Sequence, residues 1–178
     1  MGIQKALLVV GMILVGGCQI ASNLPPIRTA ESVDLNRFAG DWFVIANIPT
    51  FIETDAYNAV ESYAEPLNGK VATTFTFNKG SFEGEQKTYR PTATIREGSG
   101  NAVWGMQFVW PIKAEYRVVY IDPDYQFTII GRTKRDYVWL MAREAVIVED
   151  DYKRLLSIIE QEGYDLNKLR LVPQQSAR

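Results

Sequence analysis

Histidine is absent from the 178 residues of this sequence, and cysteine occurs once, as Cys18. Without histidine the chain lacks the commonest general base near neutral pH and the commonest metal ligand. This excludes catalytic triads and cysteine–histidine mechanisms, and it argues against a zinc site. We therefore expect no enzyme activity, no metal site and no cofactor. A single cysteine also leaves no partner for an internal disulfide, so the fold must be stabilised by packing.

An excess of charge of either sign is also missing. The chain has 19 Lys and Arg against 21 Asp and Glu, which gives a net charge of −2. Nucleic-acid-binding proteins carry basic patches, so we predict no nucleic-acid partner. Apolar residues make up 47% of the chain and aromatic residues 12%, a composition typical of a globular protein. The length fits one domain preceded by a leader.

The one long apolar run lies near the N-terminus, where residues 6–14 follow Lys5. It is too short to span a membrane and is typical of a signal-peptide core. Residues 15–18, Val-Gly-Gly-Cys, resemble a bacterial lipobox, in which the cysteine is lipidated and cleavage makes it the new N-terminus. The alternative is an ordinary cleaved signal with an incidental cysteine. Gln19 in place of Asp after the cysteine implies, by the same resemblance, sorting to the outer membrane. We predict a signal peptide at 1–17, a lipidated tether at 18–32 and a domain at 33–175.

Short β-like runs recur at hairpin spacing through the rest of the chain, at residues 42–48, 58–65, 70–77, 86–95, 101–109, 115–121, 125–131 and 136–142. Turn-forming sequences separate several of them. Eight sequential strands with short connections predict an all-β fold, an antiparallel up-and-down barrel. Several strands are apolar on both faces, so their outer face needs a cover. Residues 150–162 have helical periodicity and predict one C-terminal helix packed outside the barrel, while residues 169–172 predict a short strand beside the first.

Three motifs carry a resemblance to a known family. They are Gly40-Asp41-Trp42 at the first strand, Asp122-Pro123-Asp124-Tyr125 between the sixth and seventh, and Arg143 after the eighth. In this order and spacing the chain resembles the lipocalins, specifically the bacterial outer-membrane lipoprotein lipocalins, over residues 33–175. The resemblance implies that Arg143 stacks on Trp42 at the closed end of the barrel. It assigns structural roles to Gly40, Trp42, Asp122, Tyr125 and Arg143. The chain departs from the family at Trp42-Phe43-Val44, usually Trp-Tyr-Glu, and in the loop 49–58.

Strand alternation and the resemblance together predict a ligand site of inward-facing residues: Phe75, Trp104, Met106, Phe108, Tyr116, Tyr137 and Trp139. These side chains would line an apolar cavity with polar tips. The alternative is a barrel filled by its own side chains. We expect the Tyr116 hydroxyl to meet a ligand carboxylate or phosphate, with Arg90, Lys113 and Arg117 near the mouth. The acidic pairs 53/55 and 150/151 are expected to be solvated loop or helix-cap residues.

The resemblance thus implies a function in binding. The expected protein is a lipocalin, lipid-anchored at the periplasmic face of the outer membrane through Cys18. It would bind or transport fatty acids or lysophospholipids in the barrel cavity, in a role in membrane maintenance. The alternative is a structural or assembly lipoprotein with a filled barrel and a protein partner.

Overall fold

The computed structural model describes residues 24–175, so Cys18 and the predicted signal peptide lie outside the described residues. Its elements, in chain order, are α1 (Leu35–Phe38), β1 (Gly40–Ile48), β2 (Ala56–Tyr63), β3 (Lys70–Lys79), β4 (Gln86–Tyr89), β5 (Thr92–Ile95), β6 (Val103–Val109), β7 (Ile112–Ile121), β8 (Phe127–Gly131), β9 (Val138–Ala142), α2 (Glu149–Gln161), the 3-10 turn η1 (Leu166–Lys168) and β10 (Arg170–Leu171). No helix within residues 24–175 is long and apolar enough to cross a membrane.

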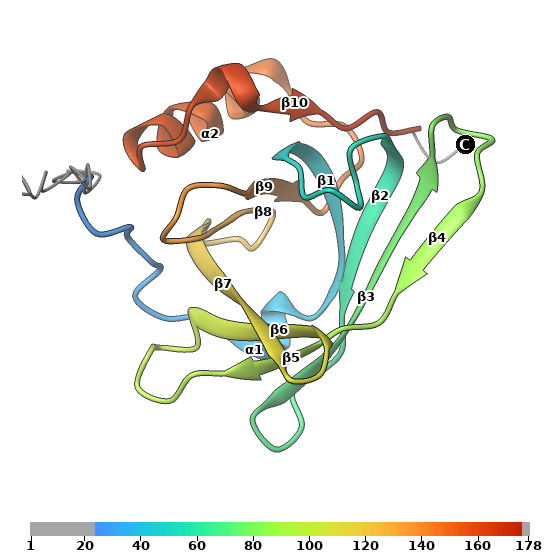
Figure 1. Ribbon diagram of the computed structural model, residues 1–178. Helices are drawn as coiled ribbons and strands as arrows, with labels where there is room; N and C mark the ends of the chain where they lie inside the picture. Colours follow the sequence, from blue (N-terminus) through green and yellow to red (C-terminus); the bar gives the residue numbers. More distant parts are fainter. Residues whose placement is uncertain (1–23, 176–178) are drawn as a thin grey trace, which may run out of the picture.

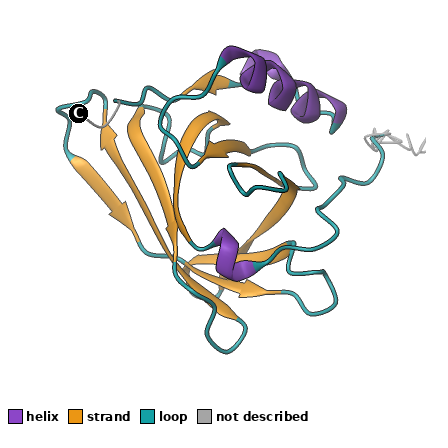
Figure 2. Ribbon diagram, turned by 180° about the vertical axis from the view of Figure 1, so that it is seen from behind, coloured by secondary structure: helices purple, strands orange, loops and turns teal. Residues whose placement is uncertain are grey.

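The strands form one closed antiparallel barrel (Figure 1). Apart from β4, which lies off the path, successive strands from β1 to β9 are neighbours. Strand β9 returns to pair with β1, where Phe43 lies opposite Ala142 and Ile48 opposite Val138. The predicted eight-stranded barrel and its outer helix α2 are confirmed. Strand β10 pairs with the outer edge of β1, as expected for residues 169–172. On the opposite side from α2, the short helix α1 lies across one end of the barrel (Figure 2).

The run 86–95, predicted as one strand, is two strands separated at Arg90 and Pro91. Strand β4 pairs with residues 75–78 of β3, and β5 pairs with residues 70–72. Proline has no backbone N–H to donate, and here its carbonyl instead accepts from Thr73 N at 3.0 Å. Of the two, only β5 continues the sheet to β6, whereas β4 pairs only with β3 among the described strands. The barrel wall is therefore unpaired between β4 and β6 at one end.

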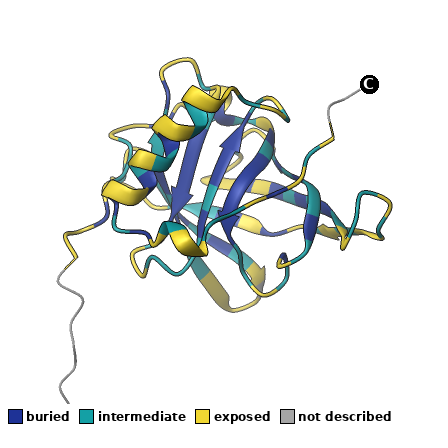
Figure 3. Cartoon of the chain, turned by 90° about the horizontal axis from the view of Figure 1, so that it is seen from above, coloured by how far each residue is buried: buried dark blue, intermediate teal, exposed yellow. Residues whose placement is uncertain are grey.

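Two apolar layers account for strands that are hydrophobic on both faces. One layer fills part of the barrel interior, and the other lies between the barrel wall and α2. Leu155 and Ile159 of α2 are fully buried against a wall that includes Ile129 and Leu140. Figure 3 shows the exposed outer face of α2 above the buried strands. Burying each such side chain contributes about 1.5–3 kcal/mol, so the helix is part of the domain core.

Residues 24–32, predicted as the end of a tether, lie against the barrel. Ile27 is buried in the layer beneath α2. The backbone N–H of Arg28 donates to Glu162 Oε2 at 2.9 Å, and its guanidinium pairs with the same carboxylate. Ala30 N donates to Val118 O at 2.9 Å. The folded domain thus includes these residues, and any tether ends before Leu24.

Candidate ligand-binding site

The closed end of the barrel is built around Trp42 and Arg143. The guanidinium carbon of Arg143 lies 3.8 Å from the centroid of the Trp42 ring, the contact that the resemblance implies. Its Nη1 donates to Asp41 O at 2.7 Å, and its Nη2 donates to the carbonyls of residues 37–39 at 2.7–3.1 Å. The indole N–H of Trp42 donates to Phe38 O at 2.8 Å. One cation thereby satisfies the carbonyls at the end of α1 and fixes the helix across the barrel.

The other motif residues hold the same end. Gly40 has φ of +96°, and an added Cβ would lie 3.4 Å from Arg143 Nη1. Asp122 Oδ1 accepts from Phe127 N at 2.6 Å, which closes the β7–β8 turn. The Tyr125 hydroxyl accepts from Asp34 N at 2.8 Å. These contacts are structural, and Gly40, Asp122 and Tyr125 do not line the cavities described below.

Next to this closed end, the barrel interior is filled by aromatic rings. Phe38, Tyr63 and Trp104 pack with their ring centroids 5.0–5.7 Å apart, in edge-to-face pairs. Trp104 also donates its indole N–H to Asn101 O at 2.6 Å. Trp104 therefore packs in the closed-end core and does not line the cavities described below, in contrast to its predicted place in the ligand site. The reason is that α1 inserts Phe38 beneath it.

The open half of the barrel is hollow. An outer chamber of about 460 Å³ lies at the mouth, within the range of small-molecule sites. Its wall is mainly apolar, and it includes the predicted residues Phe108 and Tyr137 together with two cations, Arg90 and Arg132. Its full lining is Thr50, Phe51, Ile52, Tyr89, Arg90, Pro91, Phe108, Ala114, Arg132 and Tyr137. The filled-barrel alternative thus describes only the closed half.

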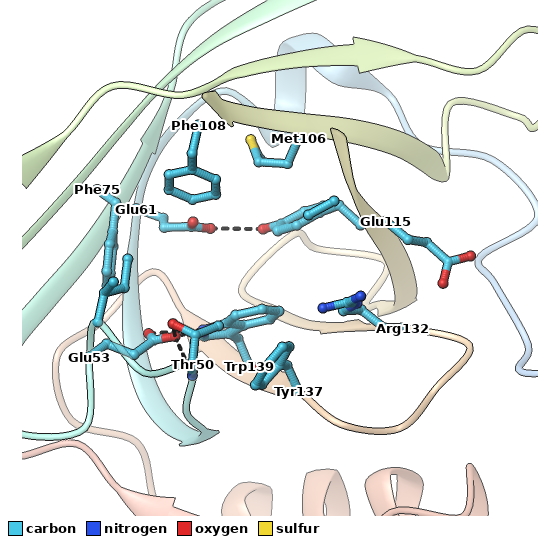
Figure 4. A pocket seen from close by; sticks show the side chains of 13 residues that line it. Thr50, Glu53, Glu61, Phe75, Met106, Phe108, Glu115, Arg132, Tyr137 and Trp139 are labelled. Atoms are coloured by element: carbon cyan, nitrogen blue, oxygen red, sulfur yellow. Dashed lines mark hydrogen bonds between the residues drawn. The ribbon is translucent and has the colours of Figure 1, made fainter. Parts of the chain in front are cut away.

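A smaller inner chamber of about 70 Å³ lies deeper in the barrel. It shares wall residues such as Ile52, Phe108 and Tyr137 with the outer chamber, so the two are adjacent. Six of the seven predicted ligand-site residues line it, namely Phe75, Met106, Phe108, Tyr116, Tyr137 and Trp139. Its wall also carries three carboxylates that were not predicted as ligand-site residues, Glu53, Glu61 and Glu115 (Figure 4).

Glu61 is held between two tyrosines. Tyr116 donates its hydroxyl to Glu61 Oε2 at 2.7 Å, and the hydroxyl of Tyr63 contacts both Glu61 Oε2 and the Tyr116 oxygen. Burial raises the pKa of Glu61 to about 7, although both tyrosine hydroxyls lower it and the charge of Glu53 raises it further. The Tyr116 hydroxyl is therefore committed to Glu61, which corrects its predicted role toward a ligand anion. Strand alternation could have indicated that Glu61 faces the barrel interior, because it shares a strand face with Ala59 and Tyr63.

Glu53 was expected to be a solvated loop residue, and it is buried instead. Its Oε1 accepts from Thr50 N at 2.9 Å and Thr50 Oγ1 at 2.8 Å. Its Oε2 accepts from Asn47 Nδ2 at 3.2 Å and from the Trp139 indole at 3.1 Å. Glu53 thus ties the loop after β1 to β9 and orients Trp139 in the cavity wall. By contrast, Asp150 and Asp151 lie in the first turn of α2, as expected.

The predicted mouth cations have different surroundings. Arg90 lines the outer chamber. Lys113 donates to Thr94 Oγ1 at 3.2 Å, and Arg117 pairs with Glu115 at 2.6 Å. Arg132, not predicted, lines both chambers and lies 3.5 Å from Asp136 Oδ1. This contact of Nε is an ion pair and too long for a good hydrogen bond, and the guanidinium carries further N–H donors that can bind an anion at the mouth.

Comparison with known proteins identifies the family. The model of the lipocalin-like domain matches residues 33–174. The chain belongs to the lipocalin family. It is 29% identical to temperature-induced lipocalin-1 of Arabidopsis thaliana over 156 residues, 83% of each chain. It is 25% identical to the outer membrane lipoprotein Blc of Citrobacter freundii over 162 residues, 88% of this lipocalin and 89% of that protein.

Solved lipocalin structures share the fold. Insecticyanin from the tobacco hornworm Manduca sexta superposes with a TM-score of 0.66 at 16% identity, over 84% of this chain and 85% of that one. Lobster apocrustacyanin A1 gives 0.62 at 12% identity, over 88% and 94%. Lipocalins are in general binding or transport proteins, and the cavity described above lies within the barrel that these structures share.

Proposed function

We propose that this lipocalin is anchored to a bacterial outer membrane through Cys18, at its periplasmic face, and binds or transports fatty acids or lysophospholipids there. The observation that carries the ligand class is the outer chamber, an apolar space of about 460 Å³ with Arg90 and Arg132 on its wall. An acyl chain would occupy the apolar wall, and the two guanidinium groups would meet its carboxylate or phosphate. The lipobox-like residues 15–18 and the similarity to Blc lipoproteins support the anchor. A role in membrane maintenance is part of the same proposal.

The size of the site sets the expected affinity. Each buried methylene contributes about 0.8 kcal/mol, so a chain of about twelve contributes roughly 10 kcal/mol. Lost translational freedom and ordering of the chain remove several kcal/mol of this. What remains corresponds to a Kd of about micromolar or weaker. The selectivity should then depend on chain length more than on head-group detail.

Exposed apolar side chains near the mouth support transfer of the ligand from a membrane. Phe51, on the wall of the outer chamber, is 87% exposed. Trp110 and Ile112, in and beside the β6–β7 turn, are 82% and 71% exposed. Large exposed apolar groups mark interaction surfaces, and tryptophan is enriched at membrane interfaces. In the proposed arrangement the mouth faces the lipid surface that holds the anchor.

Two measurements test the proposed ligand class. Native mass spectrometry of the purified full chain should show co-purifying lipid. Titration with fatty acids and lysophospholipids should change tryptophan fluorescence in a saturable way, because Trp139 lines the inner chamber. Absence of saturable binding by any of these lipids would contradict the proposal.

A further inference from the structure

The inner chamber contains an acceptor without a donor. Glu61 is 7% exposed, and both of its tyrosine partners contact Oε2. Among residues 24–175, no group donates a hydrogen bond to Glu61 Oε1 and no cation forms an ion pair with this carboxylate. Figure 4 shows the Glu61 side chain at the cavity, with a dashed line that marks a hydrogen bond to its carboxylate. Glu61 lines the inner chamber and its Oε1 is not fully enclosed by protein, so this oxygen can accept a hydrogen bond from a donor that enters from outside the chain.

The groups around Glu61 do not supply that donor. From its own strand comes Tyr63, and from β7 comes Tyr116, whose hydroxyl already donates to Oε2. Strand β7 also contributes Glu115, a carboxylate that pairs with Arg117. The loop after β1 contributes Glu53, a second negative charge that disfavours ionisation of Glu61. Arg132, from the β8–β9 connection, lies on the wall of both chambers and pairs with Asp136. The remaining side chains on β3, β6 and β9 are Phe75, Met106 and Trp139, which do not titrate.

The polarity of the cavity therefore changes with depth. Glu53 and Glu61 line only the inner chamber, Arg90 lines only the outer one and Arg132 lines both, with largely apolar walls throughout. A ligand anion at the bottom would face two carboxylates, whereas an ammonium or hydroxyl group there would complete the coordination of Glu61. About 70 Å³ is room for such a small polar group but not for an acyl chain.

We propose that the inner chamber is a subsite for a hydrogen-bond donor, an ammonium or a hydroxyl group, at the buried end of an otherwise apolar ligand, and that Glu61 Oε1 accepts it. This deepens the proposed function and rests on it, because the apolar body of the ligand occupies the outer chamber. A fatty acid without such a group binds with its carboxylate at Arg90 and Arg132, and its chain end leaves Glu61 Oε1 without a donor.

Three probes of equal chain length separate these chemistries: decylamine, 1-decanol and decanoate. At pH 8.5 the amine is protonated and decanoate is ionised. The full chain should bind decylamine at least tenfold more tightly than decanoate, with 1-decanol between them. Glu61→Gln should weaken decylamine at least tenfold, the scale of a hydrogen bond to a charged group, and should leave decanoate unchanged or tighter. Glu65→Gln, an exposed carboxylate just beyond the same strand, is the matched control and should change nothing.

The pH dependence provides a second readout. Between pH 6 and 8.5 none of the three probes changes its own charge. The affinity of the wild type for decylamine should therefore rise with pH as Glu61 ionises, and the affinity of Glu61→Gln should not change with pH. Tyr116→Phe removes a hydrogen bond that lowers the Glu61 pKa, so the midpoint of this rise should move to higher pH. An unmoved midpoint would contradict the assignment to Glu61.

The possible failures are distinguishable. If Glu61→Gln weakens all three probes equally, or leaves decylamine unaffected, the donor subsite is wrong while lipid binding in the outer chamber stands. If neither these probes nor the lipids bind in a saturable way, the proposed function is wrong, and the subsite with it. Near-ultraviolet circular dichroism should first establish that the variants have native packing.

Discussion

The buried carboxylate of Glu61 should make the stability of this lipocalin depend on pH even without ligand. The ordinary pKa of a glutamate, 4.5, is raised to about 7 in the folded chain, mainly because burial disfavours the charged form. In the unfolded chain the group is solvated and returns to its ordinary value. Between these two pKa values the folded state keeps a proton that the unfolded state has released.

The sign and the size follow from this difference. Since the folded state binds more protons between pH 4.5 and 7, the free energy of unfolding falls as pH rises through that window. Below pH 4.5 Glu61 is protonated in both states, and above pH 7 it is ionised in both. Outside this window, therefore, its contribution to the free energy of unfolding does not change with pH. Each pKa unit corresponds to about 1.4 kcal/mol, and the full loss is therefore about 3 kcal/mol. Glu61→Gln removes the titration and keeps the shape of the side chain.

Urea unfolding of the full chain and of Glu61→Gln at pH 5, 6, 7 and 8 measures the effect. Every other titrating group is common to both proteins and cancels in the difference between them. Relative to the wild type, the variant should gain about 2–3 kcal/mol between pH 5 and pH 8. A difference that is constant with pH, or that grows toward low pH, would refute a buried Glu61 with a raised pKa.

Four further predictions concern the anchor, the closed end, the cavity and the mouth. Cys18→Ser should block lipidation and processing, and unchanged membrane fractionation and gel mobility would contradict the anchor. Trp42→Ala should cost about 3–5 kcal/mol and Arg143→Ala less, and a double-mutant cycle in urea should show coupling, since additive losses would exclude the stacked contact. Trp139→Ala should weaken acyl-chain binding at least tenfold in a titration, whereas Trp104→Phe, outside the cavity wall, should not. Replacing Trp110 and Ile112 by serine should slow uptake of a fluorescent fatty acid from vesicles but leave its equilibrium affinity unchanged, and equal uptake rates would place the mouth away from the lipid.

The barrel was predictable because its sequence is locally consistent. Strand periodicity, turn residues and the helical pattern of residues 150–162 all agree with the observed elements. The error at residues 86–95 had a visible cause, because Pro91 interrupts the run and proline is disfavoured within paired strands. Residues 24–32 were misjudged for another reason. Their composition is typical of a linker, but the contacts of Ile27 and Arg28 with the region around α2 depend on tertiary structure.

The ligand site was only partly predictable because alternation gives the face of a strand and not its depth along the barrel. Trp104 and Phe108 share a face of β6, yet Trp104 packs on Phe38 in the closed end and Phe108 lines both chambers. Depth is set by α1, whose insertion fills the lower barrel. Glu53 was predicted to be solvated because a lone glutamate is usually exposed, and no prediction was made for Glu61.

The position of Glu61 also bears on the choice between binding and structural roles. A filled barrel would be more stable with an apolar side chain here, since the ionised carboxylate costs about 3 kcal/mol above pH 7. That cost already includes the favourable contacts of two tyrosine hydroxyls with Oε2, and Oε1 is left without a donor from the described residues. Strongly perturbed carboxylates in cavities are associated with functional sites. A group that destabilises the folded chain and lies on a cavity wall is therefore better explained by recognition of a polar ligand group than by packing.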